Sequence, residues 1–273
     1  MTEKSVNISG QKISYRVAGE GPRVMLVHGF AEDQDVWRYQ APLIASKYRL
    51  IIPDLPGSGN SGRIPEISME SMAEVLRQIL ATETNDEYKA ATMVGHSMGG
   101  YITLAFADKH PELLDGFGLF HSTAFPDTEE KKATRRKSIE FIQKHGTAEF
   151  IRQSTPNLFT ENFRNNQGTQ VADLIERNSH FDPQSLIAYY RAMIERPERI
   201  NTLKAFLRPI LFIIGQQDKA VPYEDSLKQC YLPRMAAVHI LESSAHMGMW
   251  EEQEKSSQAL LSFLEWVQEA RPQ

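Results

Sequence analysis

The chain has 273 residues, of which 41% are hydrophobic and 24% charged, and its formal net charge is -5 at pH 7. This is the composition of an ordinary globular protein, and the negative charge disfavours nucleic-acid partners, which normally meet a basic stripe. The single cysteine, Cys230, excludes an internal disulfide and is typical of a reducing compartment. The first residues show no signal-peptide pattern, and no apolar run approaches the ~20 residues of a membrane span. We therefore expect a cytoplasmic protein without membrane partners.

Short apolar runs alternate with helical patterns, which is typical of a mostly parallel sheet with helices on both faces. Residues 6–9 and 12–17 predict an opening antiparallel pair around Gly10. The later predicted strands are 23–27, 49–52, 91–94, 115–120, 209–214 and 237–241. The predicted helices among them are 36–46, 68–82, 98–109 and 252–268. The pattern indicates an α/β protein.

One long region interrupts this alternation. Between residues 122 and 204 the sequence predicts helices at 129–144, 148–153, 169–178 and 184–195, and no strand. A helical insert between two strands of a sheet is expected to cover the strand ends as a cap. The predicted organisation is an α/β core formed by residues 1–121 and 205–273, with a cap insertion at 122–204.

A glycine-rich motif follows the predicted strand 91–94. Its sequence, Gly95-His96-Ser97-Met98-Gly99, is G-x-S-x-G placed before a helix, the context in which this motif presents a nucleophile. A sharp strand-to-helix turn strains the backbone of the serine, and flanking glycines remove side chains that would collide there. The helix amino terminus favours developing negative charge. We therefore predict that Ser97 is a nucleophile.

A serine nucleophile needs a base, and the base needs an orienting acid. Asp218 lies on the loop after the predicted strand 209–214, and His246 lies beyond the strand 237–241. The order serine, acid, histidine is the chain order that accompanies this motif on an α/β sheet, and each residue follows a strand end, where such sheets place their chemistry. We predict Asp218 as the acid and His246 as the base.

Other residues compete for these roles. His28, which precedes Gly29, and His96, which precedes Ser97, are alternative bases. His121, which follows a predicted strand, is a third. Asp127 is the alternative acid, because some proteins with this motif carry the acid before the cap. The residues directly after the strand, 121–123, contain no carboxylate, which favours Asp218.

An oxyanion formed by attack on a carbonyl needs two backbone N–H donors. Met98, after the nucleophile, is expected to supply one, and Phe30 in the loop after strand 23–27 the other; the alternative is that Phe30 is only a core residue. Phe30, Met98, Phe125 and Met247 are the candidates for the substrate pocket, whereas Trp37, Tyr101 and Trp250 are as readily core residues. The sequence shows no clustered metal ligands and no phosphate-binding loop, so we expect no metal and no cofactor.

Together these residues resemble the α/β-hydrolase superfamily, in its small, capped branch. The resemblance implies an eight-stranded sheet with helices on both faces and a helical cap inserted after the sixth strand. Epoxide hydrolases and haloalkane dehalogenases carry aspartate where this chain has Ser97, and carbon–carbon-bond hydrolases often carry asparagine where it has His96. The cap opening at residues 121–125 is somewhat similar to that of 3-oxoadipate enol-lactonases. The motifs that carry the resemblance are His28-Gly29-Phe30, residues 54–61, residues 95–100, residues 215–218 and His246.

The leading hypothesis is a serine hydrolase that cleaves ester or lactone bonds of a small to medium, largely apolar substrate through an acyl-enzyme. A non-catalytic ligand-binding protein of the same fold is an alternative, because fold alone does not decide function. Carbon–carbon-bond hydrolysis or perhydrolysis with the same three residues are further alternatives. The expected partner is a small molecule, and the oligomeric state stays open.

Overall fold

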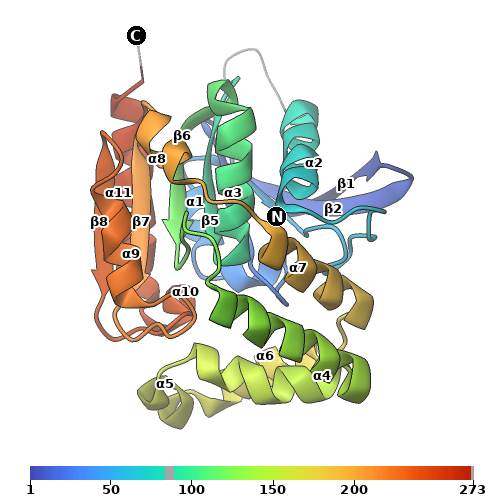
Figure 1. Ribbon diagram of the computed structural model, residues 1–273. Coiled ribbons are helices and arrows are strands. Elements are labelled where there is room, and N and C mark those ends of the chain that lie inside the picture. The colour runs from blue at the N-terminus through green and yellow to red at the C-terminus, as the bar shows by residue number, and fades with distance from the viewer. Residues whose placement is uncertain (84–88, 272–273) are drawn as a thin grey trace.

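The computed structural model describes residues 1–83 and 89–271. Its strands form one sheet in the order β1-β2-β4-β3-β5-β6-β7-β8 (Figure 1). The bounds are β1 Thr2–Ile8, β2 Gln11–Ala18, β3 Arg23–Val27, β4 Arg49–Pro53, β5 Ala91–His96, β6 Leu114–Phe120, β7 Ile210–Gly215 and β8 Ala236–Leu241. β2 pairs with β1 and β4 in antiparallel fashion, and all other pairs are parallel. The predicted mostly parallel eight-stranded sheet is confirmed.

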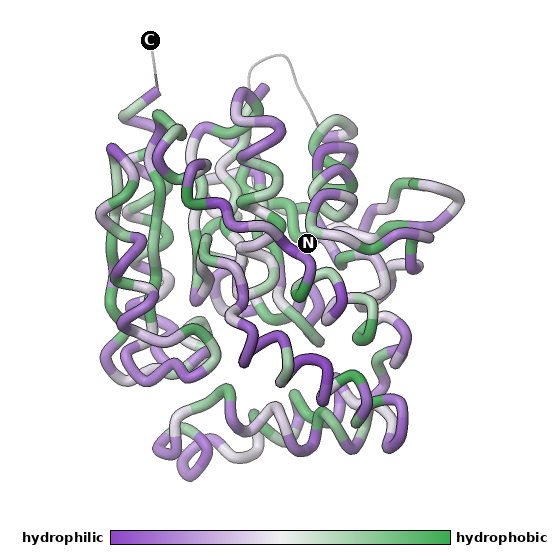
Figure 2. Tube along the Cα trace, in the orientation of Figure 1, coloured by the Kyte–Doolittle hydropathy of each residue, from purple (hydrophilic) through white to green (hydrophobic). Residues whose placement is uncertain are grey.

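Helices cover both faces of this sheet. Those described are α1 Ala41–Ala45, α2 Met69–Thr82, α3 Met98–Lys109, α4 Glu129–Ser154, α5 Glu161–Asn166, α6 Gly168–Asn178, α7 Pro183–Glu195, α8 Ile200–Ala205, α9 Tyr223–Cys230, α10 Gly248–Glu251 and α11 Gln253–Glu269. One apolar core joins the sheet to α2 and α3, and a second joins it to α1 and α11. Every residue of β3, β5 and β7 is buried, as expected for parallel strands covered on both faces, and β7 is hydrophobic along most of its length (Figure 2).

The predicted cap lies between β6 and β7. Helices α4 to α6 pass beyond the ends of the strands, at the bottom of Figure 1, and α4 packs against α7. The two predicted helices 129–144 and 148–153 form the single element α4, which breaks at Gly146 with φ 81° and ψ 171°. The sequence did not predict α5, which Thr160 caps by accepting a hydrogen bond from Phe163 N at 3.2 Å. The proposed core boundary at residue 205 falls at the end of α8.

One predicted helix is wrong. The range 36–46 is a 3-10 helix, Gln34–Trp37, followed by α1. Pro42 lies in the first turn of α1, where its missing N–H would have no partner in the helix and costs nothing. In the interior of a continuous helix over 36–46, the same proline would remove a hydrogen bond and break the helix. The other predicted elements of the core appear within a few residues of their expected ends.

Candidate active site

Ser97 occupies the turn between β5 and α3 with φ 51° and ψ −115°. This positive φ is costly for any residue with a side chain. A Cβ at Gly95 would lie 2.2 Å from the Gly99 carbonyl oxygen, and a Cβ at Gly99 would lie 2.4 Å from the Val27 carbonyl oxygen. These neighbours are backbone atoms, so only glycine fits at either position. The spacing of the motif is therefore a steric requirement of this turn.

The three residues predicted from separate strand ends meet beside this turn. His246 Nε2 lies 2.9 Å from Ser97 Oγ, and His246 Nδ1 lies 2.7 Å from Asp218 Oδ2. The Asp218 carboxylate can only accept, so Nδ1 carries a proton and Nε2 is free to accept the Ser97 hydroxyl hydrogen. The arrangement has the geometry of a nucleophile, a base and an orienting acid.

The protein holds Asp218 in one orientation. Its Oδ1 accepts hydrogen bonds from Ala220 N at 2.8 Å and Val221 N at 3.0 Å, which leaves Oδ2 for His246. Burial opposes ionisation of this carboxyl, but the electrostatic interaction with His246 and the hydrogen bond between the two side chains hold the pKa of Asp218 below its ordinary value. Asp218 is therefore ionised at neutral pH.

A second acid and histidine lie beneath the site, and sequence reasoning missed their pairing. His96 Nδ1 lies 2.9 Å from Glu32 Oε2, and His96 Nε2 lies 2.9 Å from the carbonyl oxygen of His246. Both neighbours of the ring are acceptors, so the ring is satisfied only when both nitrogens are protonated. Burial lowers the pKa of His96, but the charge of Glu32 more than offsets it, and the net shift is upward. The Glu32–His96 pair is a buried ion pair.

Glu32 also reaches the loop after β3. Its Oε2 accepts a hydrogen bond from Gly29 N at 2.6 Å, so one carboxylate oxygen serves both this loop and His96. Burial raises the pKa of Glu32, but His96 and the Gly29 N–H bring it below its ordinary value. The pair therefore connects the loop after β3, the Ser97 turn and the His246 backbone.

His28 orients the next peptide of the same loop. Leu55 N donates to His28 Nε2 at 2.9 Å, so His28 Nδ1 carries the proton and donates to the Gly29 carbonyl oxygen at 2.9 Å. In a planar trans peptide the carbonyl and the N–H point in opposite directions. By holding the Gly29 carbonyl oxygen in one orientation, His28 therefore also sets the direction of the Phe30 N–H. Within the described residues neither the Phe30 nor the Met98 N–H makes a hydrogen bond, as expected for donors reserved for a ligand.

A cavity of about 870 Å³ opens onto Ser97 and His246. Phe30 and Phe125, two of the predicted pocket residues, line it, as does Tyr101. The predictions for Met98 and Met247 are wrong: both side chains are fully buried in the two apolar cores and are not part of the cavity wall. Met98 lies in α3 and Met247 directly after His246, so the backbone of each is close to the site while the side chain packs behind it.

The rival residues have other partners. Asp127 is paired with Arg135 and Arg196, and His28 and His96 hold backbone groups as described. His121 is fully buried, with Gly215 N and Gly248 N each 3.1 Å from a ring nitrogen, and burial holds its pKa well below the ordinary value. Among the described contacts, only His246 reaches the Ser97 hydroxyl.

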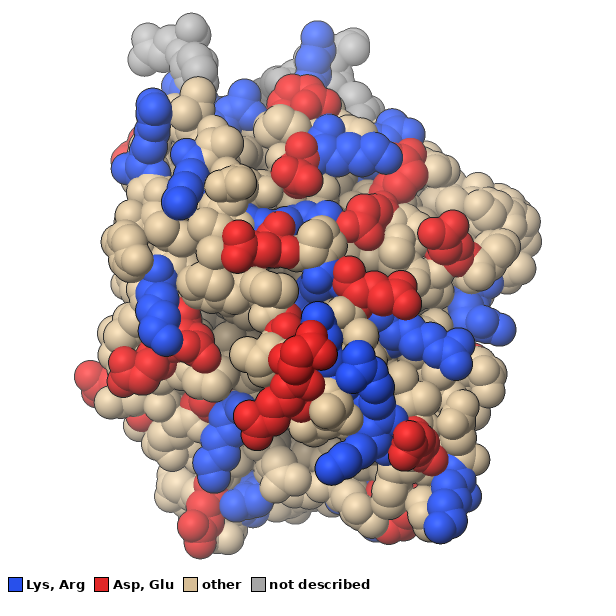
Figure 3. All heavy atoms as spheres, viewed as in Figure 1, with Lys and Arg blue, Asp and Glu red and all other residues tan. Residues whose placement is uncertain are grey.

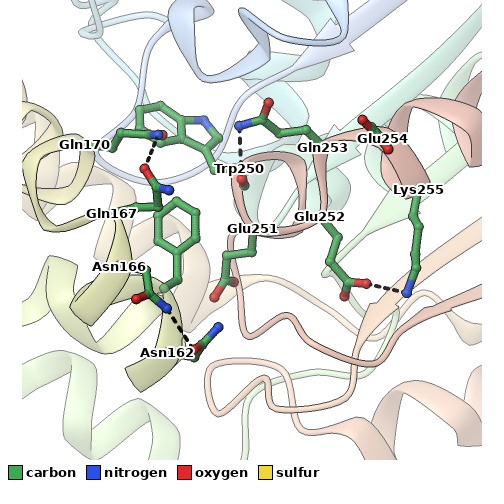
Figure 4. A pocket seen from close by; sticks show the side chains of 11 residues that line it. Asn162, Asn166, Gln167, Gln170, Trp250, Glu251, Glu252, Gln253, Glu254 and Lys255 are labelled. Atoms are coloured by element: carbon green, nitrogen blue, oxygen red, sulfur yellow. Dashed lines mark hydrogen bonds and ion pairs between the residues drawn. The ribbon is translucent and has the colours of Figure 1, made fainter.

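A second cavity of about 570 Å³ lies between the cap and the start of α11 (Figure 4). Amide and carboxylate side chains line it, including Asn162, Gln167 and Glu252, and its wall contains none of the three predicted catalytic residues. Across residues 1–83 and 89–271, no three His, Cys, Asp or Glu side chains are grouped so as to hold a metal ion.

Charges of both signs are interspersed on the molecular face shown in Figure 3, and no basic stripe crosses it. None of the helices in the described part of the chain combines the length and apolarity that crossing a membrane requires.

An eight-stranded sheet with a helical cap after β6 and a strained serine at the β5–α3 turn defines an α/β-hydrolase. The family model of the alpha/beta hydrolase fold matches residues 22–253, and the chain belongs to this family. It is 28% identical to the 2-hydroxy-6-oxo-6-(2'-aminophenyl)hexa-2,4-dienoic acid hydrolase of Metapseudomonas resinovorans, over 96% of this chain and 90% of that one.

Solved structures agree with this assignment. A thermophilic esterase from Thermogutta terrifontis, in a malate-bound structure, is 27% identical with a TM-score of 0.90, covering 98% of this chain and 99% of its own. The enol-lactonase from Burkholderia xenovorans shares the fold with a TM-score of 0.87 at 19% identity, over 96% and 99% of the two chains. By their names, these three proteins are a dienoic acid hydrolase, an esterase and an enol-lactonase.

Proposed function

We propose that this protein cleaves ester or lactone bonds of a small to medium, largely apolar substrate through an acyl-enzyme on Ser97. The observation that carries this proposal is the continuous hydrogen-bonded series Ser97 Oγ, His246 and Asp218, with spacings of 2.9 and 2.7 Å. Similarity to an esterase over 98% of the chain agrees with it.

In the proposed reaction His246 Nε2 takes the Ser97 proton as the hydroxyl oxygen attacks the substrate carbonyl. The resulting oxyanion accepts hydrogen bonds from the N–H groups of Phe30 and Met98. The carbonyl re-forms as the alkoxide leaves, and His246 returns the proton to it. Water, activated by His246, then releases the acid and restores Ser97. Asp218 stabilises the imidazolium in both steps, and no step needs a cofactor.

Hydrolysis of a carbon–carbon bond is the second candidate. The dienoic acid hydrolase relative, similar over 96% of the chain, favours it, whereas His96 at the position before Ser97 disfavours it because such enzymes often carry asparagine there. A ligand-binding protein without turnover is disfavoured because every catalytic position is chemically competent.

A fluorophosphonate probe tests the proposed nucleophile, because it reacts with an activated serine. We expect wild-type protein to be labelled and Ser97→Ala to be unlabelled, with Ser122→Ala as a control for a neighbouring serine that donates to the Ser97 carbonyl oxygen. Steady-state assays on p-nitrophenyl esters, lactones and a dienoate ring-fission product then separate the two reactions. Absence of labelling of the wild type would contradict the proposed function.

A further inference from the structure

A buried cluster of charge forms part of the cavity wall, on the side of the cap. Asp127 precedes α4, and its carboxylate, 0% exposed, pairs with Arg135 Nε at 2.5 Å and Arg196 Nη1 at 3.0 Å. The two arginine side chains are 12% and 3% exposed, and all three residues line the cavity that contains Ser97. Two guanidinium groups against one carboxylate leave an excess of one positive charge in a site shielded from solvent.

Two aromatic rings next to the arginines also interact with this excess positive charge. The Arg196 guanidinium lies 3.8 Å from the Tyr101 ring centre, and that of Arg135 lies 5.7 Å from the Tyr190 ring centre. Burial alone would raise the pKa of Tyr101, but the charges of Arg196, Lys131 and Arg135 hold it below its ordinary value. The positive charge is therefore only partly neutralised by Asp127.

Not all donors of this cluster are occupied. Arg196 donates to the carbonyl oxygens of Met193 at 2.7 Å and Phe125 at 3.0 Å as well as facing Asp127. Arg135 directs Nε and Nη2 at Asp127, and its Nη1 has no hydrogen bond within the described residues. The Tyr101 hydroxyl, which belongs to another wall residue, also has none there. Neither of these two groups is among the described buried polar atoms that lack a partner, so both are accessible from the cavity that their residues line. They can therefore donate to a ligand that supplies acceptor oxygens.

On the basis of the hydrolase function proposed above, we propose that Arg135 and Tyr101 bind a carboxylate of the substrate, remote from the bond that Ser97 cleaves. Arg135 Nη1 and the Tyr101 hydroxyl are its donors, and one carboxylate neutralises the excess charge. Phe30, Leu158 and Val221 line the same cavity, so the rest of the substrate is apolar. The substrate class is thus a carboxylate-bearing ester or lactone, such as a half-ester of a dicarboxylic acid or an ester of a hydroxybenzoate.

Matched pairs of substrates test this site, because each pair differs only in the remote charge. The first pair is the mono-p-nitrophenyl ester of glutarate and p-nitrophenyl pentanoate, with the charge on the acyl side. The second is the acetate ester of 4-hydroxybenzoate and p-tolyl acetate, with the charge on the leaving group. We expect wild-type protein to favour the charged member of at least one pair in kcat/KM.

Arg135→Met is expected to reduce that preference at least tenfold, because it should raise KM of the charged ester much more than KM of the neutral ester. Arg135→Lys keeps the charge and a bond to Asp127, and it should retain part of the preference. Arg136→Met, at an exposed position on the same helix, should behave as wild type. Equal loss for both members of a pair would assign Arg135 a structural role only and overturn the proposal, as would a wild type without preference in either pair.

Binding to Ser97→Ala separates this proposal from the proposed function, because it needs no turnover. Calorimetry with monomethyl glutarate and 4-acetoxybenzoate should show binding that Arg135→Met abolishes in the Ser97→Ala background. If wild type is not labelled by fluorophosphonate yet this binding persists, the hydrolase function fails and the carboxylate site stands. If Ser97 is labelled and neither ligand binds, the carboxylate site fails alone.

Discussion

Replacing Glu32 with Gln tests whether the buried ion pair beneath Ser97 holds the site together. Gln keeps an oxygen that can accept from Gly29 N, but it removes the charge that stabilises the His96 imidazolium. A neutral ring has one N–H, so one of three bonds must be lost: His96 gives up residue 32 or the His246 carbonyl oxygen, both now 2.9 Å away, or the Gln amide turns its NH2 toward His96 and gives up Gly29 N. The variant should therefore lose stability and catalytic geometry together.

The magnitude follows from burial, since the side chains of His96 and Glu32 are 0% and 5% exposed. Removing one member of a buried ion pair costs about 3–5 kcal/mol of stability. Because the Gln side chain keeps one acceptor oxygen, we expect the cost to lie at the lower end of this range, at about 3 kcal/mol. For a chain of this size that lowers Tm by roughly 6–12 °C. Displacement of His246 by a fraction of an ångström should lower kcat/KM about tenfold to hundredfold.

Thermal unfolding as a function of pH is the decisive assay. Glu32 has a lowered pKa, so its contribution is complete above the ordinary carboxyl value of 4.5 and is lost as pH falls through the lowered value. His96 has a raised pKa, so its contribution is complete below the ordinary value of 6.5 and is lost as pH rises through the raised value. Wild type should therefore lose Tm on the alkaline side, and Glu32→Gln should lose less there.

The control is Glu74→Gln, which removes a surface ion pair with Arg77 and should cost no more than about 1 kcal/mol. A Glu32→Gln protein that unfolds within about 1 °C of wild type, with the same alkaline dependence, would refute the ion pair as a source of stability.

Two further variants test the site and the cap. Asp218→Asn should lower kcat by about four orders of magnitude with little change in KM, because an amide can donate to His246 Nδ1 and stabilise the wrong tautomer; steady-state kinetics measure this, and a loss below tenfold would argue against Asp218 as the acid. Gln229→Ala should lower the free energy of unfolding by about 2–4 kcal/mol, because buried Gln229 accepts from Ala124 N at 2.9 Å and donates to the Ser122 carbonyl oxygen at 2.8 Å. Urea denaturation checks this against the exposed Gln258→Ala, and equal midpoints would contradict it.

The sheet and the three candidate catalytic residues were predictable because each depends on local sequence. A buried parallel strand is a continuous apolar run, and a strained turn requires glycine at fixed spacing. The candidates Ser97, Asp218 and His246 could therefore be selected as residues that follow predicted strands in the expected chain order. The directions of side chains were not predictable in the same way. Met98 and Met247 adjoin the site in sequence, yet their side chains point into the cores.

Long-range pairs of charged residues carried no local signal either. Glu32 and His96 are 64 positions apart, and Arg196 reaches Asp127 from the far end of the cap. A buried charge requires a partner, but the sequence alone does not show which charges are buried. Each partner became identifiable only once the sheet had brought the β3 and β5 ends together and the cap had folded over them.

The cap and the His246 loop are joined by hydrogen bonds, and this limits how a substrate can enter. His246 N donates to the Leu158 carbonyl oxygen at 2.9 Å, and Glu251 accepts from Thr160 N and Ala245 N at 2.7 and 2.8 Å. Lifting this part of the cap would break bonds that hold His246, the proposed base. The cavity wall also includes exposed residues of α4 and α9. We therefore expect a substrate to enter between these two helices, because that route leaves the bonds around His246 intact.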